Sequence, residues 1–241
     1  MAATGITSAM VLAAGYGQRM RPLTDDRPKP LVSLAGRPLL DHVLDRLSVA
    51  GVSRAVVNVH YMPEMIENHL ARRTRPEIFI SDERPKILDT GGAVQNALCL
   101  LGSAPFFVHN SDSVWIEKNG STLSRMMDAY NETTMDSLLL LAPVATSMGY
   151  DGRGDYALGE DGCPRRRRDG ETVPFVFTGV SINHPRLFRN APTGPFSILR
   201  LWDEAEAAGR LAAIQLDGLW MHVGTPEALA EAEERLHGRE N

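Results

Sequence analysis

The feature that most constrains the fold of this chain is the stretch of residues 12–31, which reads LAAGYGQRMRPLTDDRPKPL. It continues an apolar run, residues 9–14, whose composition is typical of a buried strand. It then becomes dense in Gly, Pro, Arg and Lys, which is typical of a loop. Because Gly15 and Gly17 lack a Cβ, the backbone there can turn several N–H groups toward one anion. The sequence therefore predicts a strand that delivers an anion-binding loop.

Positive side chains follow the glycines in the same loop. Arg19, Arg21 and Lys29 place fixed charge beside the backbone amides, so a polyphosphate is the expected ligand. Two common phosphate loops are excluded. The chain contains no GxxxxGKS or GxxxxGKT string, and Met20 stands where the third glycine of GxGxxG is required.

The loop resembles the signature of the sugar-1-phosphate nucleotidyltransferases, LAAGxGxRMxPLTxxxPKPL, at every fixed position. Agreement at so many independent positions disfavours the alternative of a surface loop with incidental basic residues. The resemblance extends from Met10 to about Leu236. It implies an α/β, Rossmann-like nucleotidyltransferase fold, with a mainly parallel central sheet flanked by helices, in a single domain of residues 1–241.

The resemblance also implies roles for residues of the loop. Lys29 would hold the α-phosphate or the incoming sugar phosphate, and Arg19 would hold the departing phosphates, so both are candidate catalytic residues. The residues implied in nucleotide binding are Ala13, Ala14, Gly15, Gly17 and Arg19.

Composition excludes several classes of protein. The net charge of -5 and the pI near 5.8 argue against a general nucleic-acid binder. Cys99 and Cys163 are the only cysteines, so neither a disulfide framework nor a structural zinc site is predicted. The longest apolar run, around residues 138–142, is far shorter than a membrane span. We therefore expect a cytoplasmic protein that binds neither nucleic acid nor membrane.

Hydrophobic periodicity after the loop predicts alternating helices and strands. Helices are expected over residues 38–50 and 63–72, and strands over residues 54–59 and 77–80. A βαβαβ alternation is typical of a parallel sheet with crossover helices. Ligands of such sheets bind at the carboxyl ends of the strands, which is where the signature loop begins.

The segment DTGG, residues 89–92, precedes a helical pattern. Thr90 could simply cap that helix, while Gly91 and Gly92 could admit a ligand close to the backbone. The segment is similar to the ETGG string of the N-acetylmuramate-1-phosphate uridylyltransferases, a branch of the same family. The resemblance implies that Thr90, Gly91 and Gly92 take part in binding the nucleotide.

An acidic residue follows the next predicted strand, residues 105–109. Asn110, Ser111 and Asp112 end this strand, and a carboxylate at that position is costly unless it is paired or bound to a metal. The resemblance implies that Asp112 is catalytic and holds Mg²⁺, and that Asn110 lies against the sugar phosphate. Ser111 replaces the glycine usual in the family. The alternative is an Asp that only caps a turn.

Two further strings are similar to segments on the sugar side of the family's pocket. Gly154 and Asp155 belong to GRGDY, which taken alone is as typical of a turn as of a ligand site. Thr178 and Gly179 belong to a strand-like segment, residues 175–183. The resemblance implies that all four bind the sugar phosphate. Between them lies the arginine run, Arg165–Arg168, which we interpret as a solvated hairpin face in a chain this acidic.

The last motif is WMHVGTP, residues 220–226. Thr225 and Pro226 are expected as N-cap and first residue of a final helix. The family has Asp as a second metal ligand where this chain has His222, which is its one serious departure. An imidazole can ligate a metal but favours Mn²⁺ over Mg²⁺, so Mg²⁺ is the expected cofactor with Mn²⁺ possible. Contact with a phosphate, or packing beside Trp220, is an equal alternative.

The resemblance implies an enzyme that joins a nucleoside triphosphate to a sugar-1-phosphate and releases pyrophosphate. The acceptor oxygen already carries charge, so it needs no general base, and catalysis rests on positioning and electrostatics. DTGG and GRGDY favour UTP and N-acetylmuramate-1-phosphate or a related hexose-1-phosphate, which would place the enzyme in the supply of cell-wall precursors. A cytidylyltransferase for a phospho-alcohol such as phosphocholine, and a non-catalytic binder of nucleotide sugars, remain alternatives. We expect a monomer or a weak homo-oligomer.

Overall fold

The fold is built outward from β1 (Ser8–Leu12), the strand that carries the signature loop. A computed structural model of the chain describes residues 5–160 and 162–238. Side chains of β1 alternate between two cores, because Ala9 and Val11 pack on one face of the sheet and Met10 on the other. The strand pairs in parallel with β4 (Arg54–Val59) and β6 (Phe106–Asn110) and is buried on both sides.

The central sheet is mixed, with most strands pointing in one direction. Its strands pair in the order β10-β9-β11-β6-β1-β4-β5. Two further strands form a branch, in which β8 pairs with β11 and β12 pairs with β8. β11 (Phe175–Asn183) runs antiparallel to both β6 and β8, while β12 is parallel to β8. The remaining strands of this sheet are β5 (Glu77–Asp82), β8 (Ser137–Pro143), β9 (Tyr156–Leu158), β10 (Pro164–Arg166) and β12 (Leu211–Gln215).

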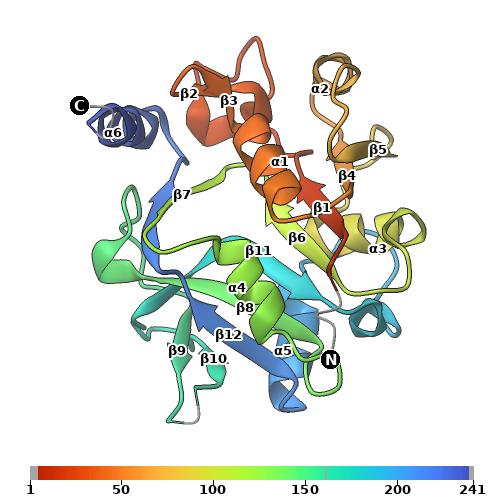
Figure 1. Cartoon of the computed structure of the whole chain (residues 1–241), viewed down its shortest axis with the longest axis vertical. Helices are drawn as coiled ribbons and strands as arrows, with labels where there is room; N and C mark the ends of the chain where they lie inside the picture. The colour runs from red at the N-terminus through yellow and green to blue at the C-terminus, as the bar shows by residue number, and fades with distance from the viewer. Residues whose placement is uncertain (1–4, 161, 239–241) are drawn as a thin grey trace.

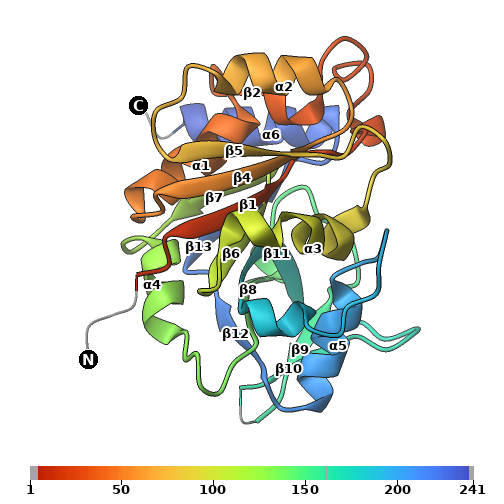
Figure 2. The same cartoon turned by 90° about the vertical axis from the view of Figure 1, so that its right-hand side faces the viewer.

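Helices cover both faces of this sheet (Figures 1 and 2). One core lies between the sheet and α1 (Leu39–Val49), α2 (Pro63–Leu70) and α4 (Thr122–Ala129). The other lies beneath α3 (Asp89–Leu101) and α5 (Leu199–Ala207), which Figure 2 shows on the face toward the viewer. The apolar stripes of these helices supply residues to the two cores.

A third core lies to one side of the main sheet. β7 (Ser113–Glu117) pairs antiparallel with β13 (Gly218–His222), and α6 (Pro226–His237) packs nearby (Figure 1). The small hairpin of β2 (Ser33–Leu34) and β3 (Arg37–Pro38) contributes to the same core. Through this pairing, His222 at the end of β13 lies opposite Ser113, shortly after β6.

The structure confirms the predicted α/β fold and the parallel order around β1. The predicted cap of the last helix is also confirmed, since the Thr225 side chain accepts a hydrogen bond from the Ala228 amide at 3.3 Å. The prediction was incomplete at one place. No element was predicted for residues 113–117, which form strand β7, and the pairing of β7 with β13 was not foreseen. None of the helices within residues 5–160 and 162–238 is long and apolar enough to cross a membrane.

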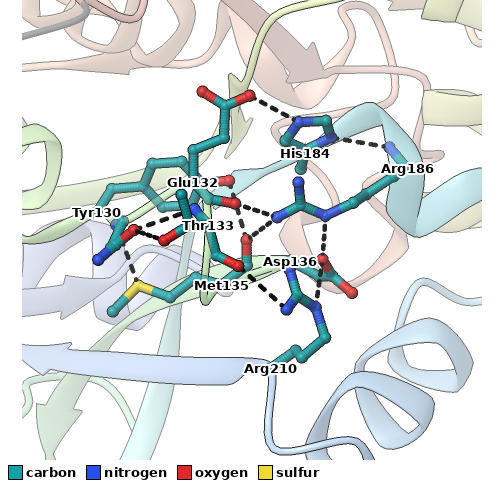
Figure 3. A network of polar contacts seen from close by, with 9 residues as sticks. Tyr130, Glu132, Thr133, Met135, Asp136, His184, Arg186 and Arg210 are labelled. Carbon is teal, nitrogen blue, oxygen red and sulfur yellow. Dashed lines mark hydrogen bonds and ion pairs between the residues drawn. The ribbon is translucent and has the colours of Figure 1, made fainter.

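A network of polar contacts joins the segments at the end of the sheet opposite the signature loop (Figure 3). Asp136, just before β8, accepts a hydrogen bond from Nε of Arg186 after β11 and lies 2.9 Å from Nε of Arg210 before β12. Nη2 of Arg186 also donates to the Met135 carbonyl at 2.7 Å. Burial alone would raise the pKa of Asp136, but the two guanidinium groups outweigh it and lower the pKa below its usual range.

We expect Asp136→Asn to lower the free energy of unfolding at pH 7 by about 1–3 kcal/mol, because two partly buried guanidinium groups lose their counterion. The lowered pKa means that this stabilisation is present above the unfolded-state value of about 3.9 and is lost as the pH falls through the folded value. Urea unfolding at pH 7 and at pH 3 measures both effects. Glu204→Gln, in an exposed pair, is the control; an equal loss at the two pH values would contradict the prediction.

Candidate active site

The signature loop lines a cavity of about 270 Å³ at the carboxyl ends of β1 and β6. Ala13, Ala14, Gly15 and Gly17, which the sequence predicts to bind the nucleotide, are among its lining residues. In the described part of the chain, the amides of Gly15, Tyr16 and Gly17 have no hydrogen-bond acceptor. These amides are available to an anion, which is the property required of a phosphate-binding loop.

The amide of Ala13 is not available, because it donates to Oδ1 of Asn58 at 2.7 Å. Nδ2 of Asn58 donates to Glu83 at 2.8 Å, and the other Glu83 oxygen accepts the Leu88 amide at 2.9 Å. Asn58 and Glu83 are both buried and were not predicted as site residues. The signal for Asn58 was a polar residue inside an otherwise apolar strand. These contacts fix the start of the loop relative to α3.

Lys29 forms an ion pair with Asp112 across 83 positions of sequence. The Lys29 side chain is only 12% exposed, so it is largely buried although it belongs to the loop. Burial alone would raise the pKa of Asp112, but the charge and the hydrogen bond of Lys29 lower it below its usual range. The structure thus brings together two of the three predicted catalytic residues.

The turn that carries Asp112 is held against the end of β1. The Ser111 amide donates to the Leu12 carbonyl at 3.1 Å. Ser111 does not have a positive φ, so replacing the family's glycine costs no backbone strain here. Gly179 has a φ of 85°, and a Cβ on it would lie 2.7 Å from Nδ2 of Asn110, so glycine permits this close approach. A shift in the register of β11 against β8 between Phe177 and Ser181 accompanies this approach.

A smaller cavity, of about 210 Å³, lies on the other side of Asp112. It is lined by the third predicted catalytic residue, Arg19, and by His222 and Tyr150. The His222 ring packs 5.4 Å from Trp220 between ring centroids. Burial lowers the pKa of His222, the negative charge of Asp112 opposes the shift, and Lys29 and Arg19 add to it. The imidazole is therefore neutral near pH 7 and able to act as a ligand or acceptor.

The cavity predicted for the sugar has a volume of about 400 Å³. Asp155 and Gly179 line it, and it shares Asn110 with the phosphate cavity. Thr178 is nearly fully buried, and its hydroxyl donates to the Leu140 carbonyl at 2.9 Å. In this conformation Thr178 supports the strand and lines only the small cavity beside Asp112.

The DTGG segment does not follow the capping alternative that the sequence allowed for Thr90. The helix begins at Asp89 with Leu88 in the N-cap position, so Thr90 is not the cap. The Thr90 hydroxyl instead accepts the Ile198 amide at 3.0 Å, although Thr90 lines both larger cavities. The amides of Gly91 and Gly92 both donate to the Phe196 carbonyl, at 2.9 and 3.1 Å, so neither is free for a nucleotide. Close packing against residues 194–198 is the physical reason for both glycines.

The arrangement suits the joining of two anions. Open amides line the same cavity as Lys29 and Asp112, and Arg19 lines a second cavity that shares Asp112. The larger cavity adjoins through Asn110. Among the residues that the structure describes, no group of three His, Cys, Asp or Glu residues could hold a metal ion. Asp112 and His222 together offer one carboxylate and one neutral imidazole, which fits a divalent ion whose other ligands come from phosphate and water.

Comparison with known proteins gives the chain its family. Residues 8–150 match the nucleotidyl transferase family. The chain is 49% identical over 232 residues to the N-acetylmuramate alpha-1-phosphate uridylyltransferase of Caulobacter vibrioides, covering 95% of this chain and 96% of that protein. It is 34% identical to the protein of the same name from Neisseria meningitidis serogroup B, covering 93% of this chain and 96% of that protein.

The fold agrees with this assignment. The crystal structure of UDP-glucose pyrophosphorylase complexed with UDP-glucose superposes with a TM-score of 0.80, covering 97% of this chain and 99% of that one. Its sequence identity is 19%, so this likeness shows the fold alone. The resemblance inferred from the signature loop is confirmed, and the chain belongs to the nucleotidyl transferase family and is a nucleotidyltransferase.

Proposed function

We propose that this enzyme transfers the uridylyl group of UTP to N-acetylmuramate-1-phosphate, giving the UDP-sugar and pyrophosphate. The observation that carries the proposal is the 49% identity to the uridylyltransferase of Caulobacter vibrioides over 95% of the chain. This relationship favours the uridylyl reaction over the cytidylyl alternative. We further propose that the chain is one domain, acts in the cytoplasm and supplies cell-wall precursors.

The chemistry requires alignment of two polyanions. An oxygen of the sugar phosphate attacks the α-phosphorus of UTP, a new P–O bond forms, and the bond to the β-phosphate breaks with release of pyrophosphate. The amides of the signature loop and Arg19 bind the triphosphate, and Lys29 lies against the phosphate that is attacked. Lys29 is held before the reaction by its pair with Asp112, so it stabilises the transferred charge without rearranging.

Enzymes of this family generally use a divalent metal ion. We propose Mg²⁺, with Mn²⁺ as an alternative, and Asp112 and His222 are the residues that would hold it. When bound, such an ion neutralises phosphate oxygens and thereby lowers the repulsion between the two substrates. Lys29 then remains beside Asp112 to bind a phosphate.

A pyrophosphate-release screen tests the proposed reaction. We expect UTP with N-acetylmuramate-1-phosphate to give the highest kcat/KM among the common nucleoside triphosphates and a panel of sugar-1-phosphates. A higher kcat/KM with CTP or GTP would overturn the base assignment while leaving the reaction class intact. A ligand-induced rise in melting temperature without pyrophosphate release from any pair would identify a non-catalytic binder instead.

We expect Lys29→Met and Arg19→Ala each to lower kcat by roughly 10³-fold, because each removes a charge that stabilises the transferred phosphate. Arg27→Ala is the control, since Arg27 is exposed and paired with its neighbour Asp26. Steady-state kinetics alongside melting temperatures separate a lost catalytic group from a lost fold. Activity within tenfold of the wild type in a folded Lys29→Met protein would contradict the assigned role.

We expect His222→Asp to lower the Mg²⁺ concentration needed for half-maximal activity, because a carboxylate suits this hard cation better than an imidazole. The ratio of activity with Mn²⁺ to activity with Mg²⁺ should fall as well. Metal titrations at saturating nucleotide measure both quantities. An unchanged Mg²⁺ requirement and an unchanged metal ratio would show that His222 is not a ligand.

A further inference from the structure

The arginine run contains one partly buried cation that has no counterion among the described residues. Arg165 forms an ion pair with Glu171, and Arg166 forms one with Asp203. Arg167 has no carboxylate within salt-bridge distance among residues 5–160 and 162–238. Its side chain is partly buried, and it lines the cavity of about 400 Å³. An unpaired guanidinium in the wall of a cavity is a binding group for an anion.

Among the residues that the structure describes, backbone carbonyls alone hold the guanidinium of Arg167 in place. Its Nε donates to the Gly154 carbonyl at 2.9 Å, and Nη1 donates to the Glu171 carbonyl at 3.5 Å. The backbone of the same residue is also fixed, since its amide donates to the Asp155 carbonyl at 2.8 Å. These acceptors orient the planar group without neutralising its charge, and they leave Nη2 for a ligand.

The GRGDY string provides this support. Gly154 has a φ of 74°, and a Cβ on it would lie 2.1 Å from the Val173 carbonyl oxygen, so only glycine fits. The Gly154 amide donates to the Tyr150 hydroxyl at 3.1 Å, which fixes the peptide on its other side. The GRGDY string therefore positions the Arg167 guanidinium. This gives a physical reason for the similarity of the string to that of the muramate-type enzymes.

Acidic residues also line this cavity, but two of them are already engaged. Oδ2 of Asp155 accepts the Phe177 amide at 2.9 Å, and Oδ1 of Asp89 accepts the Thr90 amide at 2.6 Å. Asp169 lines the cavity but is exposed to solvent. Carboxylates of this kind accept hydrogen bonds from sugar hydroxyls, whereas a carboxylate on the ligand requires a cation. Arg167 supplies that cation.

We infer that Arg167 binds the carboxylate of an acidic sugar and so selects the acceptor substrate. This inference rests on the proposed function. N-acetylmuramate-1-phosphate carries a lactyl carboxylate on the sugar, and N-acetylglucosamine-1-phosphate is the same molecule without the lactyl group. The cavity joins the phosphate cavity through Asn110 and Thr90, so one sugar phosphate reaches both. A bidentate pair between guanidinium and carboxylate discriminates between the two sugars.

The test compares the two sugar phosphates with UTP in the wild type and in Arg167→Met. We expect kcat/KM for N-acetylmuramate-1-phosphate to fall about 10- to 100-fold, which is the strength of a hydrogen bond to a charged group. The value for N-acetylglucosamine-1-phosphate should stay within about threefold, because this acceptor has no carboxylate to lose. Arg167→Lys keeps the charge without the planar fork, so an intermediate loss is expected.

Two controls isolate the carboxylate contact. Arg168→Met removes the same charge from an exposed neighbour that does not line the cavity. This variant should leave kcat/KM unchanged for both sugar phosphates. The methyl ester of the lactyl group removes the charge from the ligand. With the wild type, esterification should lower kcat/KM by the same factor by which Arg167→Met lowers it with the unmodified acid.

The outcomes are distinguishable. If Arg167→Met lowers kcat/KM equally for both sugar phosphates, Arg167 is a structural residue. Any result that leaves the ratio of the two kcat/KM values unchanged overturns the inference. If Arg167→Met does not fold, equal use of ester and acid by the wild type would overturn it in the same way. A wild type that releases no pyrophosphate with UTP and N-acetylmuramate-1-phosphate would overturn the proposed function itself.

Discussion

The structure depends on a buried carboxylate, that of Glu83, which is 1% exposed. Each of its oxygens accepts one hydrogen bond, from Asn58 at 2.8 Å and from the Leu88 amide at 2.9 Å, and Asn58 in turn holds Ala13. A buried carboxylate costs several kcal/mol unless such bonds are complete, so the three segments must keep their relative positions. The start of the signature loop, the end of β4 and the start of α3 are therefore positioned as one unit.

The Lys29–Asp112 pair sets the electrostatics at the centre of this unit. Asp112 comes from the turn after β6, and that turn is fixed to β1 by the bond from the Ser111 amide to the Leu12 carbonyl. The loop and the acid are thus held by the same strand. In the proposed reaction, an entering phosphate would meet a cation whose position is already set, so little free energy would be lost to ordering Lys29.

Much of the fold was predictable because its signals are local. Strand β1, the amphipathic helices and the Thr225 cap follow from periodicity and capping rules that act within a few residues. The site was predictable only where a single string carries it, as the signature loop does. The role of Gly91 was not predictable, because it depends on Phe196 more than 100 positions away. The same holds for the pairing of β7 with β13 and for the contact of Asn58 with Glu83.

Burial explains why some cations of the site have counterions and others do not. Lys29 is 12% exposed, and an unpaired ammonium at that depth would lose most of its hydration, so the fold provides Asp112. Arg19 is exposed and Arg167 is partly exposed, so water solvates both before any ligand binds. Each can therefore remain unpaired among the described residues at modest cost, even in a chain with a net charge of -5. An anionic ligand that displaces this water would meet two uncompensated charges, and the proposed selectivity for anionic ligands rests on these two arginines.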